Sequence, residues 1–354
     1  MFRLVVFELH HLGDAVLALP FLRAAGSHFR VTIFCRPSVG GLLREILPDL
    51  EILEAPESWP SRLAAVRKLK LSARDVVACV WADARVHSLM RLSGAGQRVG
   101  FPMTRENYYA PDLPWRRRRL QLGKFLSRIV QTLTPGPLLT RCLTRKSSSQ
   151  SHLDCWTQLA AALDFAPNFE RPWITPRPLA LSEEVQRFLD AHRHEPILLL
   201  HPGGRLPTKR WPKFQALLER LASAPPLAAL IVAPPGEAAP HPCNEHQLLV
   251  SSPDWPTLFR MIQSATVVVC NDSLASHLAA ALGRPVVTIF GSGNPDWFAP
   301  YQNEDQVVAT NACRFRPCID RCVMPSVVCL ESVTVDRVEN QVREILEESG
   351  LGRE

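Results

Sequence analysis

Short apolar runs alternate with helix-like segments along the first hundred residues. The apolar runs read FRLVVFEL, RVTIFC, DVVACVWAD and QRVGF. Between them lie a segment that starts at Asp14 and the segments GGLLREIL and VHSLMRL, whose apolar residues recur at helical spacing. Strands that alternate with helices in this way predict βαβ units and a parallel sheet.

The same alternation begins again at about Leu179 and continues to the apolar strand PVVTIFG. Between the two halves stands PNFERPWITPRP, where four prolines in twelve residues exclude regular structure and indicate a linker. We therefore predict an α/β protein of two doubly wound, Rossmann-like domains. The predicted parts are a first domain at 1–166, a linker at 167–178, a second domain at 179–335 and a closing helix at 336–354.

Composition supports a soluble globular protein. The 354 residues are 46% hydrophobic and 21% charged, and they contain no apolar run long enough to span a bilayer. The N-terminal segment MFRLVVFELHHLGD resembles a secretory signal, but Glu8, His10 and Asp14 interrupt its apolar run too early. We expect a cytoplasmic protein.

Positive charge is concentrated between Leu113 and Gln150. The net charge of the chain is +6, whereas this stretch holds nine basic residues and no acidic one. The basic residues are Arg116, Arg117, Arg118, Arg119, Lys124, Arg128, Arg141, Arg145 and Lys146. The segment WRRRRLQLGKFLSRIVQTL is typical of a basic amphipathic helix, which could lie on an anionic membrane surface, attract an acidic substrate or simply present a solvated face. A nucleic-acid partner is not expected, because no recognisable binding module accompanies the basic run.

Polar residues stand at the first strand-to-helix junction, FELHHLGDAVLALP. Gly13 allows a tight turn, and Asp14 occupies a position suited to a helix N-cap. Asp14 could instead serve as a general base if an acceptor hydroxyl comes within hydrogen-bond reach.

A second junction reads LLLHPGGRLPTKRWP. Thr208, Lys209 and Arg210 follow a Pro-Gly-Gly turn, and together with exposed backbone amides they indicate an anion site. The segment lacks the Walker pattern, so a bound phosphate need not imply nucleotide hydrolysis. A solvated basic turn is the alternative.

The third junction is NDSLASHLAAALGRPVVTIFG. Asp272 ends a strand and Ser273 begins a helix, whose N-terminal amides favour a phosphate. His277 lies one turn beyond Ser273 on the same face, so both side chains can reach a ligand there. We interpret this junction as a diphosphate site.

Four segments, in order and spacing, make the chain resemble glycosyltransferase family 9, the ADP-heptose:lipopolysaccharide heptosyltransferases. They are LGDAVLALPFLRA, HPGGRLPTKRWP, APPGE and NDSLASHLAAALGRPVVTIFG. The resemblance covers nearly the whole chain. It implies a GT-B fold of two Rossmann-like domains facing an interdomain cleft, with acceptor bound by the N-terminal half and nucleotide-sugar by the C-terminal half.

The resemblance also implies roles for single residues. Asp14 takes the catalytic-base position, and Lys209, beside Thr208, contacts the leaving diphosphate. Glu237 falls where the family binds the nucleotide ribose. The donor-loop residues align with Asp272, Ser273 and His277. The implied reaction is inverting, metal-independent transfer of a heptose. From the charge pattern we expect the reaction to run from ADP-heptose to an anionic glycolipid at the inner face of the cytoplasmic membrane. On the acceptor side we expect Arg116, Arg117, Arg118, Arg119 and Lys124.

Two alternatives remain open. The same fold could use another nucleotide-sugar or a protein acceptor, or the chain could be a nucleotide-sugar binder without turnover. Leu274, which stands where the family usually has glycine, favours the second.

Four of the ten cysteines crowd into the segment ACRFRPCIDRCVMPSVVCL. They are Cys313, Cys318, Cys322 and Cys329. Four thiolates could enclose a tetrahedral zinc or iron ion in a structural role, although the spacing is not that of a standard zinc knuckle. Free thiols are equally compatible with the sequence, and a disulfide less so. The proposed catalysis requires no cofactor.

Overall fold

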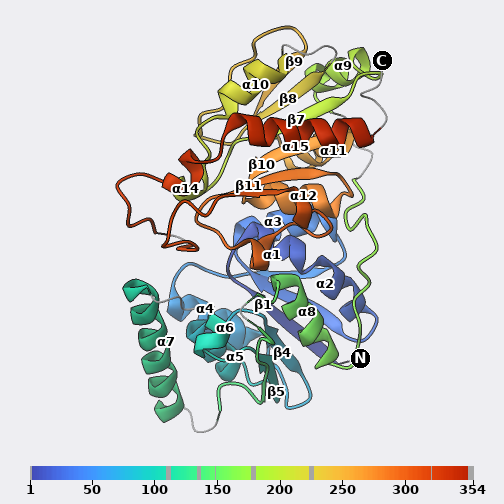
Figure 1. The fold of residues 1–354 in the computed structure, drawn as a ribbon. Coiled ribbons are helices and arrows are strands. Elements are labelled where there is room, and N and C mark those ends of the chain that lie inside the picture. The colour runs from blue at the N-terminus through green and yellow to red at the C-terminus, as the bar shows by residue number, and fades with distance from the viewer. Residues whose placement is uncertain are drawn as a thin grey trace. The chain divides into compact units, whose positions relative to one another are not determined.

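The computed structural model describes residues 2–108, 113–133, 137–147, 149–176, 181–222, 227–319 and 321–349. The chain forms two compact units, Met1–Phe169 and Glu170–Glu354, each built on its own sheet. In Figure 1 the first unit runs from blue to green and the second from green to red.

The first unit is built on a six-stranded sheet in which every adjacent pair is parallel. Its strands are β1 (Arg3–Glu8), β2 (Arg30–Cys35), β3 (Glu51–Glu54), β4 (Val76–Cys79), β5 (Gln97–Gly100) and β6 (Arg141–Cys142). They lie in the order β3-β2-β1-β4-β5-β6. The strand order reverses between β1 and β4, and ligands of doubly wound folds bind at this point, beyond the carboxyl ends of the strands.

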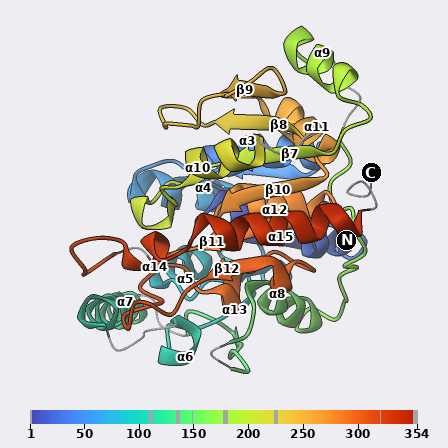
Figure 2. The same cartoon turned by 45° about the horizontal axis from the view of Figure 1, so that its top comes forward.

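Helices cover both faces of this sheet. They are α1 (Leu12–Leu17), α2 (Leu19–Gly26), α3 (Pro37–Ile46), α4 (Trp59–Lys68), α5 (Ala84–Leu92), α6 (Arg105–Tyr108), α7 (Pro114–Leu133) and α8 (His152–Ala161). One core cluster joins Val5 and Phe7 of β1 to Val66 of α4 and Leu89 of α5. On the other side α1 and α2 pack against α8, whose Trp156 ring lies 5.0 Å from the Phe21 ring. Helix α7 forms an outer layer against α5, and Figure 2 shows it nearly end-on.

The second unit repeats this topology. Its parallel strands are β7 (Ile197–His201), β8 (Ala228–Ala233), β9 (Gln247–Ser251), β10 (Val267–Asn271), β11 (Val286–Phe290) and β12 (Val307–Ala309). Their order is β12-β11-β10-β7-β8-β9, which is the order of the first sheet when the strands are numbered within the unit. The reversal therefore falls between β7 and β10. The apolar runs of β7, β10 and β11 are buried almost throughout, as expected of strands covered on both faces.

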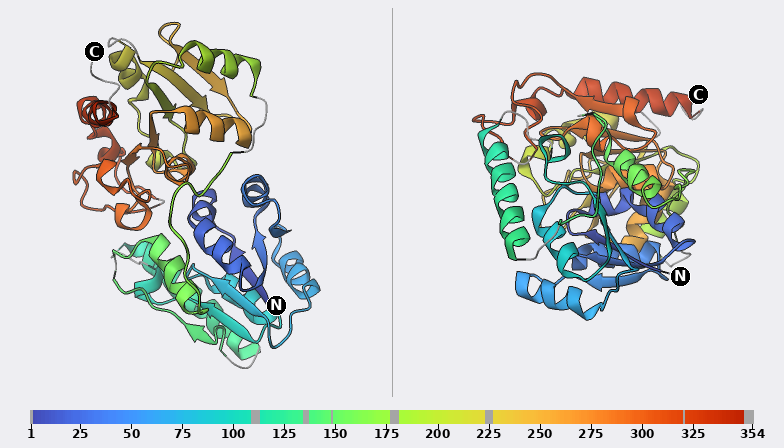
Figure 3. Two further views of the ribbon diagram at one scale, coloured as in Figure 1. Left: turned by 90° about the vertical axis from the view of Figure 1, so that its right-hand side faces the viewer. Right: turned by 90° about the horizontal axis from the view of Figure 1, so that it is seen from below.

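The helices of the second unit also lie on both faces of its sheet. They are α9 (Glu183–Ala191), the 3₁₀ turn η1 (Pro207–Lys209), α10 (Phe214–Ala222), α11 (Trp255–Ser264), α12 (Leu274–Ala281), α13 (Pro295–Phe298), the 3₁₀ turn η2 (Glu304–Gln306), α14 (Val328–Glu331) and α15 (Val335–Glu348). Helices α10 and α15 share one core cluster with the sheet. The cluster includes Leu217 of α10 and Val342 of α15. Figure 3 (left) separates α15 on one side of the sheet from α11 on the other.

The predicted fold class is confirmed, and the sequence pattern found most of the strands. It did not reveal β3, β6, β9 and β12, the edge strands of the two sheets, which are exposed or only partly buried. The proline-rich segment has no helix or strand in its described part, and it packs on the second unit: Trp173 and Ile174 are buried and their amides donate to the Ala281 carbonyl. Residues 177–180 and 350–354, where the predicted linker, second domain and closing helix begin or end, lie outside the described residues. None of the described helices is long and apolar enough to cross a membrane.

Candidate functional site

The carboxyl ends of β7 and β10 carry most of the residues predicted to bind a donor. The loop after β7 contains Thr208 and Lys209 in the turn η1, and the segment after β10 contains Asp272 and Ser273. These two strands are hydrogen-bonded neighbours at the reversal of strand order. The predicted residues therefore meet at the place where a doubly wound fold binds its ligand.

Lys209 and Asp272 form the central ion pair of this edge. Lys209 Nζ lies 2.6 Å from Asp272 Oδ2, with 20% of the lysine and 4% of the aspartate side chain exposed. Gly293 packs on the same carboxylate: a Cβ atom there would lie 1.9 Å from Asp272 Oδ2. The ion pair thus depends on a glycine after β11, and it fixes a cation beside the helix that follows β10.

Helix α12 points its N-terminus toward this edge. Ser273 is its N-cap residue, and His277 lies one turn into the helix. Ser273 Oγ and His277 Nδ1 are both buried and have no hydrogen-bond partner among the described residues. The pKa of His277 is lowered to about 4, chiefly by burial; Asp272 opposes this shift and Lys209 adds to it. A neutral imidazole, a hydroxyl and a helix N-terminus beside Lys209 can together bind an anion without burying a second charge.

Glu237, in the turn after β8, is held in place by the loop after β7. Its Oε2 accepts a 3.0 Å hydrogen bond from the Gly204 amide, and its Oε1 lies 3.2 Å from Arg210 Nη2. The Arg210 guanidinium also donates to the Gly204 carbonyl. Arg210 is therefore paired with Glu237, whereas Lys209 pairs with Asp272 next to the first residue of α12.

Sequence reasoning missed two residues that shape this edge. Asn271 is fully buried, accepts a hydrogen bond from the Trp211 amide and donates to the Pro202 carbonyl, so it ties the loop after β7 to the end of β10. The hydroxyl of Ser292 lies 3.0 Å from that of Thr208. Asn271 could have been predicted from the sequence. It is the one amide side chain at the end of an otherwise apolar strand, and a buried amide needs hydrogen-bond partners.

Asp14 lies at the equivalent edge of the first unit, after β1. The prediction that it is an N-cap is wrong: α1 begins at Leu12, His11 is the N-cap, and Asp14 is the third helical residue. Its Oδ2 accepts a 3.1 Å hydrogen bond from the His11 amide, and only 4% of the residue is exposed. The reason for the error is that His11, an uncommon N-cap, has the extended backbone that this position requires.

A second buried carboxyl, Glu8, accompanies Asp14 at this edge. Glu8 is fully buried at the end of β1, and its Oε1 accepts a 3.0 Å hydrogen bond from the His10 amide. Burial raises the pKa of Glu8 well above its ordinary value, and the charge of Asp14 raises it further. Where two carboxyls repel in this way, a protonated Glu8 leaves Asp14 free to remain ionised.

Aromatic and charged side chains connect the end of β1 to the end of the neighbouring strand β4. The His10 ring stacks on the Trp81 ring at 4.7 Å, and His10 Nε2 lies 3.3 Å from Asp83 Oδ2. Burial raises the pKa of Asp83, but the hydrogen bond and charge of His10 outweigh burial and bring the pKa to about 2. The edge of the first unit therefore presents carboxylates and aromatic rings.

The predicted basic amphipathic helix is α7. Arg117, Arg118, Arg119 and Lys124 are exposed on it, as are the apolar side chains of Leu122, Phe125 and Ile129. Arg116 was assigned to the same surface, but it is buried, because it lies one turn before Leu120 on the face that packs inward. The surface of α7 thus combines exposed cations with exposed apolar groups.

The four clustered cysteines carry no disulfide. Cys318 and Cys329 are buried, and Cys313 and Cys322 are half-buried. The pKa of Cys318 is raised to about 11, chiefly by burial and also by the other three thiols, which therefore lie within electrostatic range of it. No three of their sulfur atoms come within 4.8 Å of each other in the described structure. The metal site proposed for them stays a prediction.

Comparison with known proteins gives a family match over more than half of the chain. The family model of glycosyltransferase family 9 (heptosyltransferase) matches residues 138–325. Lipooligosaccharide heptosyltransferase 2 of Haemophilus influenzae is 28% identical over 153 residues, which cover 39% of this chain and 44% of that protein. The chain thus spans less than half the length of this curated relative.

Solved structures are similar over nearly the whole chain. A glycosyltransferase family 9 protein from Veillonella parvula matches with a TM-score of 0.67 at 15% identity, covering 98% of both chains. The E. coli heptosyltransferase WaaC, solved with ADP, matches with a TM-score of 0.61 at 15% identity, covering 97% of this chain and 100% of the other. At this identity the likeness concerns the fold.

Proposed function

The chain belongs to glycosyltransferase family 9 and has the GT-B fold, and on this premise we propose that it transfers a heptose from ADP-heptose to an anionic glycolipid of the lipopolysaccharide inner core. The transfer would invert the anomeric centre and need no metal. One observation carries the proposal: Lys209 lies beside the N-terminus of α12, where Ser273 Oγ and His277 Nδ1 are buried without partners among the described residues.

This arrangement suits the diphosphate of a nucleotide-sugar. The leaving group gains negative charge as the bond from the sugar C1 atom to the diphosphate oxygen breaks. An ammonium group and a helix N-terminus fixed in advance stabilise that charge most strongly where water is excluded. Ser273 and His277 supply hydrogen bonds that the folded chain does not itself satisfy. A relative solved with ADP is consistent with a nucleoside diphosphate here.

Glu237 suits the ribose of the same ligand. Its carboxylate is already oriented by the Gly204 amide and Arg210, and a carboxylate accepts up to four hydrogen bonds. The ribose hydroxyls would donate to its remaining lone pairs. Since both groups that orient Glu237 belong to the loop after β7, ribose and diphosphate binding would be coupled through that loop.

Asp14 would act as the general base. The acceptor hydroxyl oxygen forms a bond to C1 of the heptose, its proton moves to Asp14, and ADP leaves with the bonding electrons. A base must be ionised, and Glu8 favours this state of Asp14 by remaining protonated. The stacked rings of His10 and Trp81 offer an aromatic surface on which a sugar ring could pack.

The exposed surface of α7 supports a proposal for the acceptor and for the cellular location of the reaction. Exposed arginines beside exposed Phe125 and Leu122 favour the anionic, partly apolar surface of a membrane or glycolipid. We propose that the protein works in the cytoplasm at the inner face of the membrane. A nucleic-acid partner is not part of the proposal.

A second candidate is a relative that binds a different nucleotide-sugar, glycosylates a protein or lacks turnover. Leu274 favours the last of these, because the first helical residue of α12 carries a half-buried isobutyl group at the point where phosphate would approach the backbone.

The experiment that tests the proposal combines calorimetric titration with ADP-heptose, ADP-mannose and UDP-glucose and mass spectrometry of the product formed on a lipopolysaccharide acceptor. ADP-heptose should bind best, Lys209→Ala should weaken binding at least about tenfold, and Asp14→Asn should abolish transfer while sparing donor binding. If UDP-glucose binds best, or none of the three binds, the donor assignment is wrong.

Two matched controls sharpen this test. Asp154 occupies the third position of α8 and accepts a hydrogen bond from the amide of its N-cap residue Ser151, as Asp14 does from His11 in α1. Asp154→Asn therefore removes the charge of an equivalent capping carboxylate without touching the edge of the sheet. Arg187→Ala removes an exposed cation from α9. Both variants should retain binding and transfer.

A further inference from the structure

Two histidines and a glutamate converge at the amino-terminal edge of the second sheet. His192 Nδ1 lies 3.1 Å from Glu195 Oε2, and His246 Nδ1 lies 3.3 Å from the same oxygen. The two imidazole rings are 5.1 Å apart. Within the part of the chain that the structure describes, this is the only group of three His, Cys, Asp or Glu ligand atoms lying within 4.8 Å of one another.

The backbone brings His246 to a pair of residues, His192 and Glu195, that stand three residues apart in the chain. His192 is the C-cap residue of α9, Glu195 stands two residues before β7, and His246 immediately precedes β9. The main chain holds two of them: the Glu195 amide donates to the His192 carbonyl, and the His246 carbonyl accepts from the Ala229 amide of β8. The three side chains are therefore positioned by regular structure as well as by contact with one another.

We propose that His192, Glu195 and His246 bind one divalent transition-metal ion, for which zinc is the best match. Three ligands at 2.0–2.1 Å from a tetrahedral zinc ion are separated from each other by about 3.3 Å. The two nitrogen-to-oxygen distances already have this length. Two imidazoles and one carboxylate are a common zinc ligand set, whereas calcium and magnesium prefer oxygen ligands alone.

The burial of the group leaves room for a fourth ligand. The His192 side chain is 11% exposed, that of Glu195 22% and that of His246 43%. Water can therefore reach the ion from the His246 side. The Phe188 ring packs on the His192 ring, with 4.5 Å between their centroids.

This metal would stabilise the fold, and it would take no part in transfer. The group precedes β7, whereas Lys209 follows it, and the five residues of β7 span about 16 Å. A bound ion would join the end of α9 to β9, the strand at the edge of the sheet. The proposal is independent of the donor assignment, and so is its test.

The test uses the full chain, dialysed free of metal and titrated with Zn²⁺ alone. We expect one zinc per chain bound by these residues, a rise in Tm on binding, and nitrogen and oxygen neighbours at about 2.0–2.1 Å in X-ray absorption spectra, with no sulfur at about 2.3 Å. His246→Gln and Glu195→Gln should each weaken binding by about 100-fold, since even the loss of an outer-shell partner costs 10- to 100-fold. His246→Gln changes a half-exposed side chain, so it should fold.

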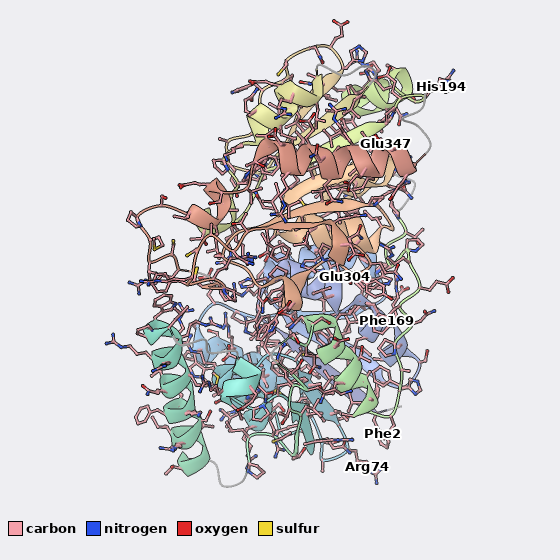
Figure 4. The ribbon with its side chains drawn as sticks, viewed as in Figure 1. Phe2, Arg74, Phe169, His194, Glu304 and Glu347 are labelled. Atoms are coloured by element: carbon pink, nitrogen blue, oxygen red, sulfur yellow. The ribbon has the colours of Figure 1, made fainter. Side chains whose placement is uncertain are left out.

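Two controls separate this group from other ligands. His194 lies just beyond the end of α9, where Figure 4 labels it, and its replacement by Gln should leave zinc binding unchanged. Cys313→Ser with Cys322→Ser should also leave it unchanged. The proposal is overturned if the wild-type chain binds no zinc, or if the bound zinc shows sulfur neighbours and survives His246→Gln.

Discussion

Lys209 Nζ lies 2.6 Å from Oδ2 of Asp272, a carboxylate that is almost completely buried. The pair joins the loop after β7 to the segment after β10, and so it serves both the fold and the proposed diphosphate site. Removing one partner from a buried pair leaves an uncompensated charge, which costs more than the pair itself contributes.

We expect Lys209→Met to lower the free energy of unfolding by about 3 kcal/mol because Asp272 is left unpaired. The double variant Lys209→Met/Asp272→Asn should recover most of this loss, although both variants should lose donor affinity. Urea denaturation of the four proteins in the cycle provides the measurement. Strictly additive effects would show that the two groups are not coupled in solution.

Leu274→Gly should increase donor affinity if the leucine side chain holds the phosphate away from the first amides of α12. A glycine at this position costs about 0.5–1 kcal/mol of helix stability, so the gain should appear in calorimetric titration with ADP and not in Tm. Ala275, the next residue, is buried, and Ala275→Gly provides the control for loosening of the helix alone. Equal affinities for the wild type and Leu274→Gly would remove the argument for a binder without turnover.

Glu8 predicts a particular dependence of stability on pH. Its folded pKa is raised above the ordinary value of 4.5, so its contribution to stability is complete below pH 4.5 and is lost as pH rises toward the folded pKa. Glu8→Gln, which imitates the protonated form, should flatten the decline in unfolding free energy above pH 4.5. The same variant should shift the acidic limb of the transfer rate if Glu8 tunes Asp14. A decline of unchanged slope would contradict the assignment of a protonated Glu8.

His277 predicts the opposite dependence. Its pKa falls from an ordinary 6.5 to about 4 in the folded chain, so its contribution is complete above pH 6.5 and is lost as pH falls toward 4. The loss amounts to about 3 kcal/mol, since one pKa unit corresponds to about 1.4 kcal/mol. His277→Gln should therefore lose less stability than the wild type between pH 6.5 and 4, as measured by urea denaturation at each pH. His87 and His201 have pKa values lowered to about 4 by burial as well, so some decline should persist in the variant.

Helix α7 predicts binding to anionic vesicles. Replacing Arg117, Arg118 and Arg119 by Gln should weaken sedimentation with phosphatidylserine-containing vesicles by about 100-fold, because each basic residue near such a surface contributes about 1 kcal/mol. Phe125→Glu should weaken it too. Phe2→Glu changes a phenylalanine of similar exposure outside α7 and should have no effect. Binding that is equal on neutral vesicles would exclude the electrostatic contribution.

The sequence predicted the fold well where strands are buried on both faces. The runs around Val5, Leu199 and Val269 are continuous and apolar, and each became a central strand. β9 was not predicted, because Gln247 and the half-buried residues after it form neither a continuous apolar run nor an alternation of apolar and polar residues. Edge strands owe their structure to the neighbour that they pair with, and one sequence does not show that neighbour.

The candidate site was predicted in part for a similar reason. Short motifs at strand ends identified Lys209 and Asp272, since parallel strands gather their carboxyl ends on one edge. No spacing rule connects Ser292 to Thr208, because this contact arises when two separate loops pack. The group of His192 and His246 was missed because 54 residues separate its two histidines along the chain, and only the pairing of β7, β8 and β9 brings them together.

Because of Gly293, the proposed enzyme should lose activity on a substitution that removes none of its functional groups. One added methyl at this position would occupy the space of Asp272 Oδ2 and push the carboxylate off Lys209. A homologue with alanine at the equivalent position would keep the Asp, Lys, Ser and His of the motif, and a reading of the motif alone would count it as active. In this chain, the lack of a side chain at position 293 is therefore as necessary to the Lys209–Asp272 pair as the two charged residues themselves.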